Sequence, residues 1–156
     1  MSKLKPTDDT VCRNRKAAFR FEILEQIGCG VMLLGTEVKS LRDKNASIEE
    51  AYARIEDDEL WLIGAHIAAY SFAHAQNHDP LRRRKLLIHS SEIRKLRPQV
   101  EQKGLTLVPL HIYFNERGIA KVTVALCRGK TLGDKRRTLQ TREHKREMDR
   151  ALHRKR

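Results

Sequence analysis

Cysteine pairs, aromatic side chains and long apolar runs are all scarce in this sequence of 156 residues. Its three cysteines, Cys12, Cys29 and Cys127, are an odd count without CxxC spacing, so we expect reduced thiols and neither a disulfide framework nor a zinc site. No apolar run approaches the roughly 20 residues that a transmembrane helix needs. Residues 1–6 are too polar for a secretory signal. Together these absences predict a cytoplasmic protein.

Positive charge, by contrast, is abundant. Lys and Arg number 32 against 20 Asp and Glu, which gives a formal net charge of +12 and a pI of about 10.0. A surplus of this size predicts a polyanionic partner, with nucleic acid first and an anionic membrane surface second. We expect a flexible leader over residues 1–13, one compact domain over 14–129 and a basic tail over 130–156.

One octet, GTEVKSLR at residues 35–42, predicts a short amphipathic helix. On a helical period the face toward the core would hold Leu34, Val38 and Leu41. The other face would present Thr36, Lys39 and Ser40, with Glu37 and Arg42 on its flanks. A carboxylate can accept the donors of an unpaired guanine and cations suit phosphates, so this face suits RNA. The alternative is an ordinary helix with a solvated polar face.

Alternating apolar residues predict several strands. Residues 19–27 are strand-like, with an alternation that slips at Leu24 and a bend or bulge expected at Gly28 and Gly30. Residues 48–67 predict a β-hairpin around an acidic loop, Glu56 to Glu59.

The second half of the domain predicts helices and then the clearest strands. Residues 81–103 are expected to form two helices, the second with Pro98 in its first turn. Residues 105–114 and 119–126 predict a hairpin, with Pro109 at an edge or a bulge. About six strands and three helices fit a mainly β fold, a small OB-like antiparallel β-barrel.

Two patterns suggest metal sites only weakly. The acidic loop 56–59 lacks interleaved ligands, and we expect a solvated turn. His74 and His78 are four residues apart within the irregular segment 68–80, without a third ligand, so we interpret them as loop histidines. We expect no metal, no cofactor and no catalytic residue.

The tail carries a net charge of +7 and few apolar residues, so we expect it to be disordered alone. If it becomes helical, four arginines at successive i+4 positions form one stripe: Arg142, Arg146, Arg150 and Arg154. A basic segment of this kind either folds against RNA or adds non-specific affinity only.

The assembled motifs resemble a known family. These are Asn14-Arg-Lys-Ala17, the octet 35–42, Arg84-Lys-Leu-Leu87, Glu101-Gln-Lys-Gly104 and Gly129-Lys-Thr-Leu-Gly-Asp-Lys-Arg136. Their order and spacing are similar to those of small protein B, the SsrA-binding protein of bacterial trans-translation. The resemblance covers the chain from about Asn14 to the C-terminus and implies an OB-like barrel with about three helices.

The resemblance also implies partners and site residues. The domain would bind the elbow of the tRNA-like domain of transfer-messenger RNA, with these contacts: Asn14, Lys16, Glu37, Lys39, Ser40, Arg42, Arg82, Arg84, Lys85, Lys121 and Lys130. The tail would enter the vacant mRNA path at the decoding region of a stalled ribosome and become helical there, using Asp134, Lys135, Arg136 and the arginine stripe. Elongation factor Tu and alanyl-tRNA synthetase would be indirect partners through the charged RNA. Thr131 and His144 depart from the family pattern, in which Lys and a nearby Trp are common.

Three other classes of function compete with this interpretation. An RNA-cleaving or RNA-modifying enzyme needs convergent titratable groups, and the histidines are scattered. A general ribosome-associated or RNA-chaperone protein shares the charge but predicts no preference for a tRNA-like elbow. Membrane binding by the tail requires more apolar residues than its four dispersed aliphatic side chains supply.

Overall fold

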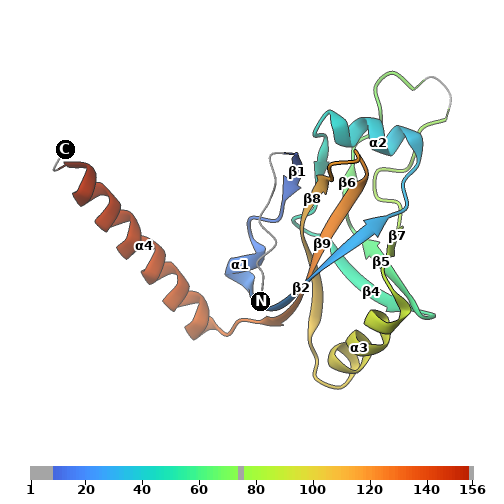
Figure 1. Cartoon of the computed structure of the whole chain (residues 1–156). Helices are drawn as coiled ribbons and strands as arrows, with labels where there is room; N and C mark the ends of the chain where they lie inside the picture. Colours follow the sequence, from blue (N-terminus) through green and yellow to red (C-terminus); the bar gives the residue numbers. More distant parts are fainter. Residues whose placement is uncertain (1–8, 74–75, 155–156) are drawn as a thin grey trace.

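The structure, a computed structural model, describes residues 9–73 and 76–154 (Figure 1). In this part of the chain the strands are β1 (Thr10–Arg13), β2 (Phe21–Val31), β3 (Ala46–Ser47), β4 (Tyr52–Glu56), β5 (Glu59–Ile63), β6 (His66–Ile67), β7 (Arg84–Leu87), β8 (Thr106–Phe114) and β9 (Ala120–Gly129). The helices are α1 (Ala17–Arg20), α2 (Gly35–Arg42), α3 (Ser90–Glu101) and α4 (Leu132–Arg154).

Six strands form a closed antiparallel ring in the order β8-β4-β5-β7-β2-β9, because β9 also pairs with β8. Strands β4 and β1 pair with different parts of β8: Leu107 pairs with β4, and residues 111–113 pair with β1. Strands β3 and β6 pair with each other in a separate small sheet, and Ile67 of β6 is buried in the same core as the ring strands. The predicted mainly β fold with about six antiparallel strands is therefore confirmed, with four helices where about three were expected.

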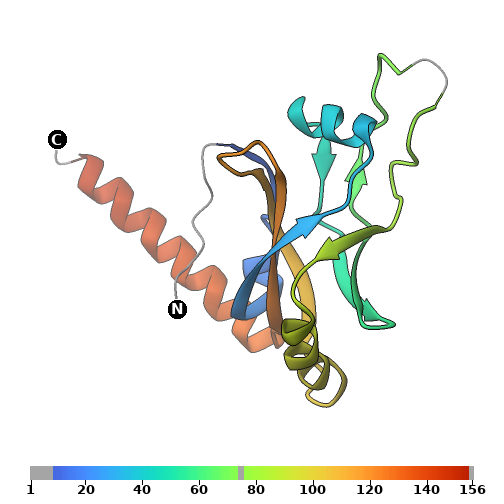
Figure 2. The ribbon, with the colours of Figure 1, turned by 45° about the vertical axis from the view of Figure 1, so that its right-hand side comes forward.

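Apolar side chains from all six ring strands fill the interior, and helices cover its two ends (Figures 1 and 2). Leu41 of α2 and Leu96 of α3 are both almost fully buried in this core. Figures 1 and 2 show the two helices at opposite ends of the ring. A smaller apolar cluster packs α1 against the outside of β8 and β9, through Ala17, Val108 and Cys127. Burial raises the pKa of the Cys127 thiol to about 11, so this cysteine is a structural, protonated thiol.

Both predicted hairpins are confirmed. Asp57 and Asp58 join β4 to β5 with positive φ angles of 48° and 60°, as a two-residue turn between twisted strands requires. In the second hairpin the register shifts between Pro109 and His111, which is the predicted bulge. The predicted slip at Leu24 also coincides with a register shift in β2, but no shift is found at Gly28 or Gly30.

The prediction of two helices over residues 81–103 is wrong. Residues 84–87 form β7, between β5 and β2, and a single helix α3 follows with Pro98 inside it rather than in a first turn. The reason lies in Arg84, which alternates with Leu86 as an inward-facing residue of β7. A charged residue in a core position hides the period of two that marks a strand.

The N-terminal end of the predicted domain differs from expectation in two places. Thr10–Arg13, assigned to a flexible leader, form β1 and pair with β8, while residues 1–8 lie outside the described part. Ala17–Arg20 form α1, so the predicted strand begins at Phe21 rather than at Phe19.

The tail forms one 23-residue helix, α4, that extends away from the ring and has no buried residue (Figures 1 and 2). The composition of this segment predicts disorder in the free chain, because it cannot bury an apolar face. Its helix has local supports instead. At its start Thr131 and Asp134 cap each other, with the Asp134 amide donating to Thr131 Oγ1 at 3.3 Å and the Thr131 hydroxyl to Asp134 Oδ2 at 2.7 Å.

Candidate functional site

The start of helix α2 is stabilised by Glu37, the third residue of the helix. The backbone amide of Leu34 donates to Glu37 Oε2 at 2.8 Å, and a carboxylate in the first turn is favoured by the helix dipole. The predicted helix over residues 35–42 is thus confirmed. Its orientation is not, because the buried residues of α2 are Glu37, Ser40 and Leu41, whereas Leu34 is exposed.

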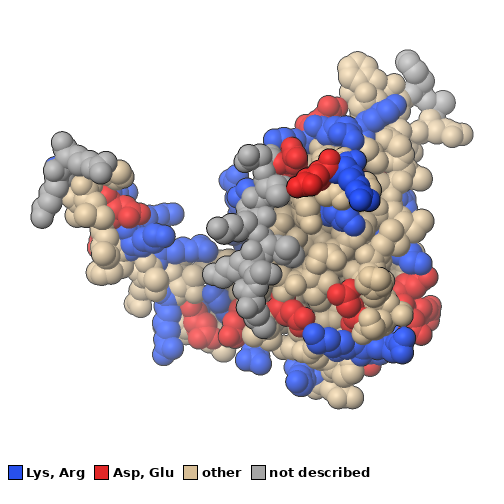
Figure 3. Space-filling model, viewed as in Figure 1, with Lys and Arg blue, Asp and Glu red and all other residues tan. Residues whose placement is uncertain are grey.

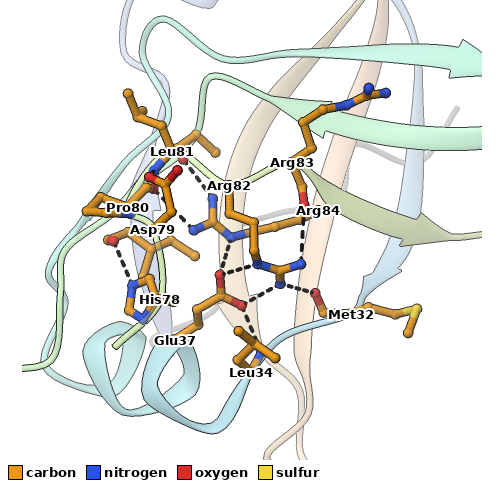
Figure 4. A network of polar contacts seen from close by, with 12 residues as sticks. Met32, Leu34, Glu37, His78, Asp79, Pro80, Leu81, Arg82, Arg83 and Arg84 are labelled. Carbon is orange, nitrogen blue, oxygen red and sulfur yellow. Dashed lines mark hydrogen bonds and ion pairs between the residues drawn. The ribbon is translucent and has the colours of Figure 1, made fainter. Parts of the chain in front are cut away.

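Glu37 is the centre of a buried ion-pair network (Figure 4). Arg82 binds both carboxylate oxygens of Glu37, through Nε at 3.1 Å and Nη2 at 2.8 Å. Arg84 Nε donates to Glu37 Oε1 at 2.9 Å. With the Leu34 amide, four donors occupy the two oxygens, and the side chain of Glu37 is 0% exposed. The expectation that Glu37 presents its carboxylate to a base is therefore wrong.

Arg84 is equally inaccessible, with 0% of its side chain exposed. Its remaining donors bind the carbonyls of Ala65, at 2.7 Å, and Pro80, at 3.1 Å. An arginine satisfied in this way cannot contact an RNA phosphate, which corrects its predicted role. Arg82 lies at the surface of the network, about one-third exposed.

Electrostatics favour the charged form of this network. Burial by itself raises the pKa of Glu37, but hydrogen bonds from Arg82 and from the Leu34 amide, together with the charge of Arg84, outweigh it and hold that pKa below its ordinary value. Burial lowers the pKa of Arg84, partly offset by Glu37, yet a guanidinium remains protonated in proteins. One carboxylate thus neutralises one of two arginines, and the network retains a net positive charge at the surface end.

Two other polar residues of α2 bind residues on either side of the segment that the structure leaves undescribed, at Ala68 and at His78. The Ser40 hydroxyl donates to the carbonyl of Ala68 at 2.6 Å, and Ser40 is buried, contrary to its predicted outward position. Thr36 Oγ1 lies 2.8 Å from Nδ1 of His78, whose Nε2 lies 2.9 Å from the carbonyl of Ile67. Because a carbonyl only accepts, Nε2 donates to Ile67, and Nδ1 is the ring atom that pairs with the Thr36 hydroxyl. His78 is therefore a buried anchor, while His74 lies outside the described residues.

Lys39 and Arg42 are the residues of the octet that do point outward. The Arg42 guanidinium lies 4.7 Å from the centre of the Phe114 ring, and its Nη2 is 3.5 Å from the carbonyl of Gly118. Lys39 Nζ lies 5.4 Å from the Tyr70 ring. Figure 3 shows Lys and Arg side chains gathered over α2, at the top of the ring. We call α2 and the segments packed on it, residues 68–73 and 76–83, the α2 end.

The N-terminal residues of the predicted site have structural partners. Asn14 accepts the Ala17 amide at 3.1 Å and donates to the carbonyls of Pro109, at 3.2 Å, and Ile48, at 3.4 Å. It therefore fixes α1 to β8 rather than offering its amide to RNA. Lys16 is exposed and forms ion pairs with Glu49 and Glu50.

The remaining predicted cations are spread over the surface of the domain. Lys85 on β7 pairs with Glu59 at 2.6 Å, and Lys121 on β9 is partly exposed. Lys130 binds the carbonyl of Ala18 at 2.8 Å and the hydroxyl of Thr138 at 3.0 Å, so it joins the start of α4 to α1. Lys85 and Lys130 therefore have partners other than the α2 end, whereas Lys121 lies at the start of β9, three residues after the Gly118 carbonyl that Arg42 contacts.

On α4 the predicted tail residues form an extended basic surface. The arginine stripe is exposed throughout: Arg142, Arg146, Arg150 and Arg154. The first of them, Arg142, has its guanidinium 6.0 Å from the centre of the Phe19 ring. Arg136 is exposed, Lys135 is half-buried, and Asp134 caps the helix.

Other kinds of site find no support in the described ranges. They contain no group of three or more His, Cys, Asp or Glu side chains arranged to hold a metal ion. Among the helices of residues 9–73 and 76–154, none is long and apolar enough to cross a membrane.

Sequence reasoning missed the anchor between Thr36 and His78 and the exposed ring of Phe72. The anchor has no sequence signal, because its partners are 42 residues apart. Phe72 could have been singled out as an aromatic residue inside an irregular polar segment.

The chain matches the family model described as SmpB protein over residues 11–154. It is 49% identical over 153 residues to the SsrA-binding protein of Rhodopirellula baltica, which covers 98% of this chain and 87% of that protein. It is 53% identical over 140 residues to the SsrA-binding protein of Thermosynechococcus vestitus, covering 89% and 91%.

A solved chain from the work "tmRNA-SmpB: a journey to the center of the bacterial ribosome" has the same fold, with a TM-score of 0.66 and 52% identity. The match covers 80% of this chain and 86% of that one. The resemblance inferred from the motifs is confirmed, and the chain belongs to the SmpB protein family.

Proposed function

We propose that this protein binds transfer-messenger RNA and brings it to stalled ribosomes for trans-translation. Relatives at about half identity are SsrA-binding proteins, and the similar solved chain belongs to work on tmRNA-SmpB in the bacterial ribosome. A net charge of +12 suits a polyanionic RNA. The proposed place of action is the cytoplasm.

The observation that carries the proposal is the division of labour within the octet. Glu37, Ser40 and Thr36 face inward and fix α2 to β7, Ala68 and His78 respectively. Lys39 and Arg42 are left exposed on this rigid support. Cations held in fixed positions can match the phosphates of a folded RNA, whereas cations on a flexible chain match any polyanion. The α2 end is therefore the surface proposed for the tRNA-like domain and its elbow.

The helix α4 is proposed to occupy the vacant mRNA path near the decoding region of the small subunit. Its exposed arginine stripe can pair with ribosomal RNA phosphates along the length of the helix. Because α4 is joined to the domain at Lys130 and near Phe19, its N-terminal turn has a defined direction. Elongation factor Tu and alanyl-tRNA synthetase are proposed as indirect partners through the charged RNA, and the protein is proposed to act without catalysis.

A binding experiment tests the role of the α2 end. Full-length protein is titrated with the tRNA-like domain of transfer-messenger RNA at two salt concentrations, against an RNA duplex of equal length. The test variant is Lys39→Ala with Arg42→Ala, and the matched control is Arg94→Ala with Lys103→Ala, which removes two exposed cations at the α3 end.

We expect the α2 variant to lose affinity and to have a salt dependence of log K shallower by roughly 1.4–1.8, because two phosphate contacts are removed. The control variant should keep the affinity and the salt dependence of wild type. Equal losses in the two variants, or equal binding of duplex and tRNA-like RNA by wild type, would favour a general ribosome-associated or RNA-chaperone protein. Hydrolysis or modification of the RNA by the purified protein would favour an enzyme.

A truncated chain ending at Lys130 tests the role of α4. Since α4 has no buried residue, the domain should fold and keep its affinity for the tRNA-like domain. Tagging of incomplete chains on stalled ribosomes should be lost. Loss of RNA affinity in the truncated chain would overturn the assignment of α4 to the ribosome.

A further inference from the structure

Two aromatic rings stand at the surface of the α2 end without covering the core. Phe72 is 74% exposed, the highest exposed fraction of any Phe, Tyr or Trp residue that the structure describes. The rings of Tyr70 and Phe72 meet edge to face, with centroids 5.7 Å apart and planes at 63°. The sequence contains only eight Phe, Tyr and Trp residues, so two adjacent ones on an irregular segment require an explanation other than packing.

The segment that carries these rings is held by specific hydrogen bonds. Asn77 accepts the Tyr70 amide at 3.1 Å and donates to the Tyr70 carbonyl at 2.8 Å, so one side chain fixes both backbone groups of Tyr70. The Ala73 amide closes a turn on the same carbonyl, at 3.1 Å. The two ends of the segment are fastened to α2 through Ala68 and His78. The rings therefore have a defined position relative to Lys39.

The charge around the rings indicates what they contact. Lys39 Nζ lies 5.4 Å from the centre of the Tyr70 ring, and Arg82 and Arg83 follow at the other end of the segment. A cation beside an exposed aromatic ring matches a nucleotide, which offers a phosphate and the π-face of a base within a few ångströms. Bases within a duplex are already stacked and paired, so the ring suits an unpaired base. An uncharged apolar peptide would not use the neighbouring cations.

We propose that Phe72, supported by Tyr70, stacks on an unpaired base of the bound RNA while Lys39 contacts the adjacent phosphate. This inference rests on the proposed function and adds to it a contact with a base, next to the phosphate contacts proposed for Lys39 and Arg42. The stacking contact would give a preference for RNA with exposed bases over duplex RNA. The carboxylate of Glu37 cannot give this preference because it is buried.

The test compares three single variants of the full-length protein in binding to the tRNA-like domain of transfer-messenger RNA. Phe72→Leu removes the ring and keeps an apolar side chain, Phe72→Trp keeps a ring, and Leu132→Ala truncates a residue of similar exposure, 76%, at the start of α4. Phe72 and Leu132 are exposed, so none of the variants should affect folding.

We expect Phe72→Leu to weaken binding about 5-fold to 150-fold, the range for loss of one base–aromatic stack. Its salt dependence should match wild type because no charge changes. Phe72→Trp and Leu132→Ala should bind like wild type. The indole of Phe72→Trp should be quenched when the RNA binds, after subtraction of the Trp61 signal measured in wild type.

Two outcomes separate this inference from the function on which it rests. If wild type prefers the tRNA-like domain but Phe72→Leu binds as well as wild type, the stacking contact is wrong and the function stands. The same holds if the indole is not quenched on binding. If wild type shows no preference for the tRNA-like domain, the proposed function itself fails.

Discussion

Replacing Glu37 by Gln tests the role that the structure gives to this residue. The variant keeps the size of the side chain and removes its charge. At present Glu37 accepts four hydrogen bonds, from the Leu34 amide, twice from Arg82 and once from Arg84. An amide accepts with one oxygen only, and its NH₂ group would face donors of the arginines. Arg84, with no exposed surface, would then have only neutral acceptors: the carbonyls of Ala65 and Pro80 and, at most, the new amide oxygen.

The expected loss follows from the burial of Arg84. Removing one partner of a buried ion pair leaves an uncompensated charge and costs about 3–5 kcal/mol in the free energy of unfolding. This is a large part of the roughly 5–15 kcal/mol that stabilises a typical protein. The matched control is Glu59→Gln, which removes the partner of Lys85 on the same strand β7, at a partly exposed site. A pair of that kind contributes about 0–1 kcal/mol.

Urea denaturation at neutral pH, followed by circular dichroism, measures both variants against wild type. We expect a large fall in the unfolding midpoint for Glu37→Gln and little change for Glu59→Gln, with similar m-values. At urea concentrations well below its unfolding midpoint, where the variant is folded, Glu37→Gln should also bind RNA less tightly, although it carries more positive charge than wild type. A loss below about 1 kcal/mol for Glu37→Gln, comparable with the control, would refute the buried network. Tighter RNA binding would refute the dependence of the site on it.

Three further predictions concern residues with assigned contacts. First, the difference in unfolding free energy between wild type and Glu37→Gln should be constant above the ordinary glutamate pKa of about 4.3 and should shrink below it, because the folded-state pKa of Glu37 is lowered. A difference that grows in acid would contradict that direction. Second, Asn14→Ala should cost about 1–3 kcal/mol in urea denaturation, because the acceptor of the Ala17 amide and two carbonyl contacts are lost; a stable variant with weakened RNA binding would instead make Asn14 an RNA contact. Third, Thr131→Ala should lower the helix content of the free protein by circular dichroism, because the cap with Asp134 is lost, whereas Thr141→Ala should leave that helix end intact.

The strands with a clear period could be predicted from the sequence. In residues 105–126 nearly all inward positions are apolar, and the bulge at Pro109 follows from a missing amide donor. The strand β7 could not be predicted, because its inward position is Arg84 and the carboxylate that neutralises it is 47 residues away. Local periodicity contains no information about such a partner.

The candidate site was predicted in its location but not in its orientation. The octet does form a helix at one end of the ring, and Lys39 and Arg42 are exposed as expected. Polarity predicted that Glu37 and Ser40 would be exposed as well, yet each has buried partners contributed by distant segments. A polar residue can face inward when long-range contacts satisfy it, and only the structure identifies those contacts.

Hydrogen–deuterium exchange of the full-length protein, with and without the tRNA-like domain of transfer-messenger RNA, tests most directly where the RNA binds. Slower exchange over residues 35–42 and 68–73 on adding the RNA, with residues 90–103 unchanged, is the predicted result, because only the first two segments belong to the α2 end. Slower exchange confined to residues 90–103 would place the RNA at the α3 end and would contradict the proposed site.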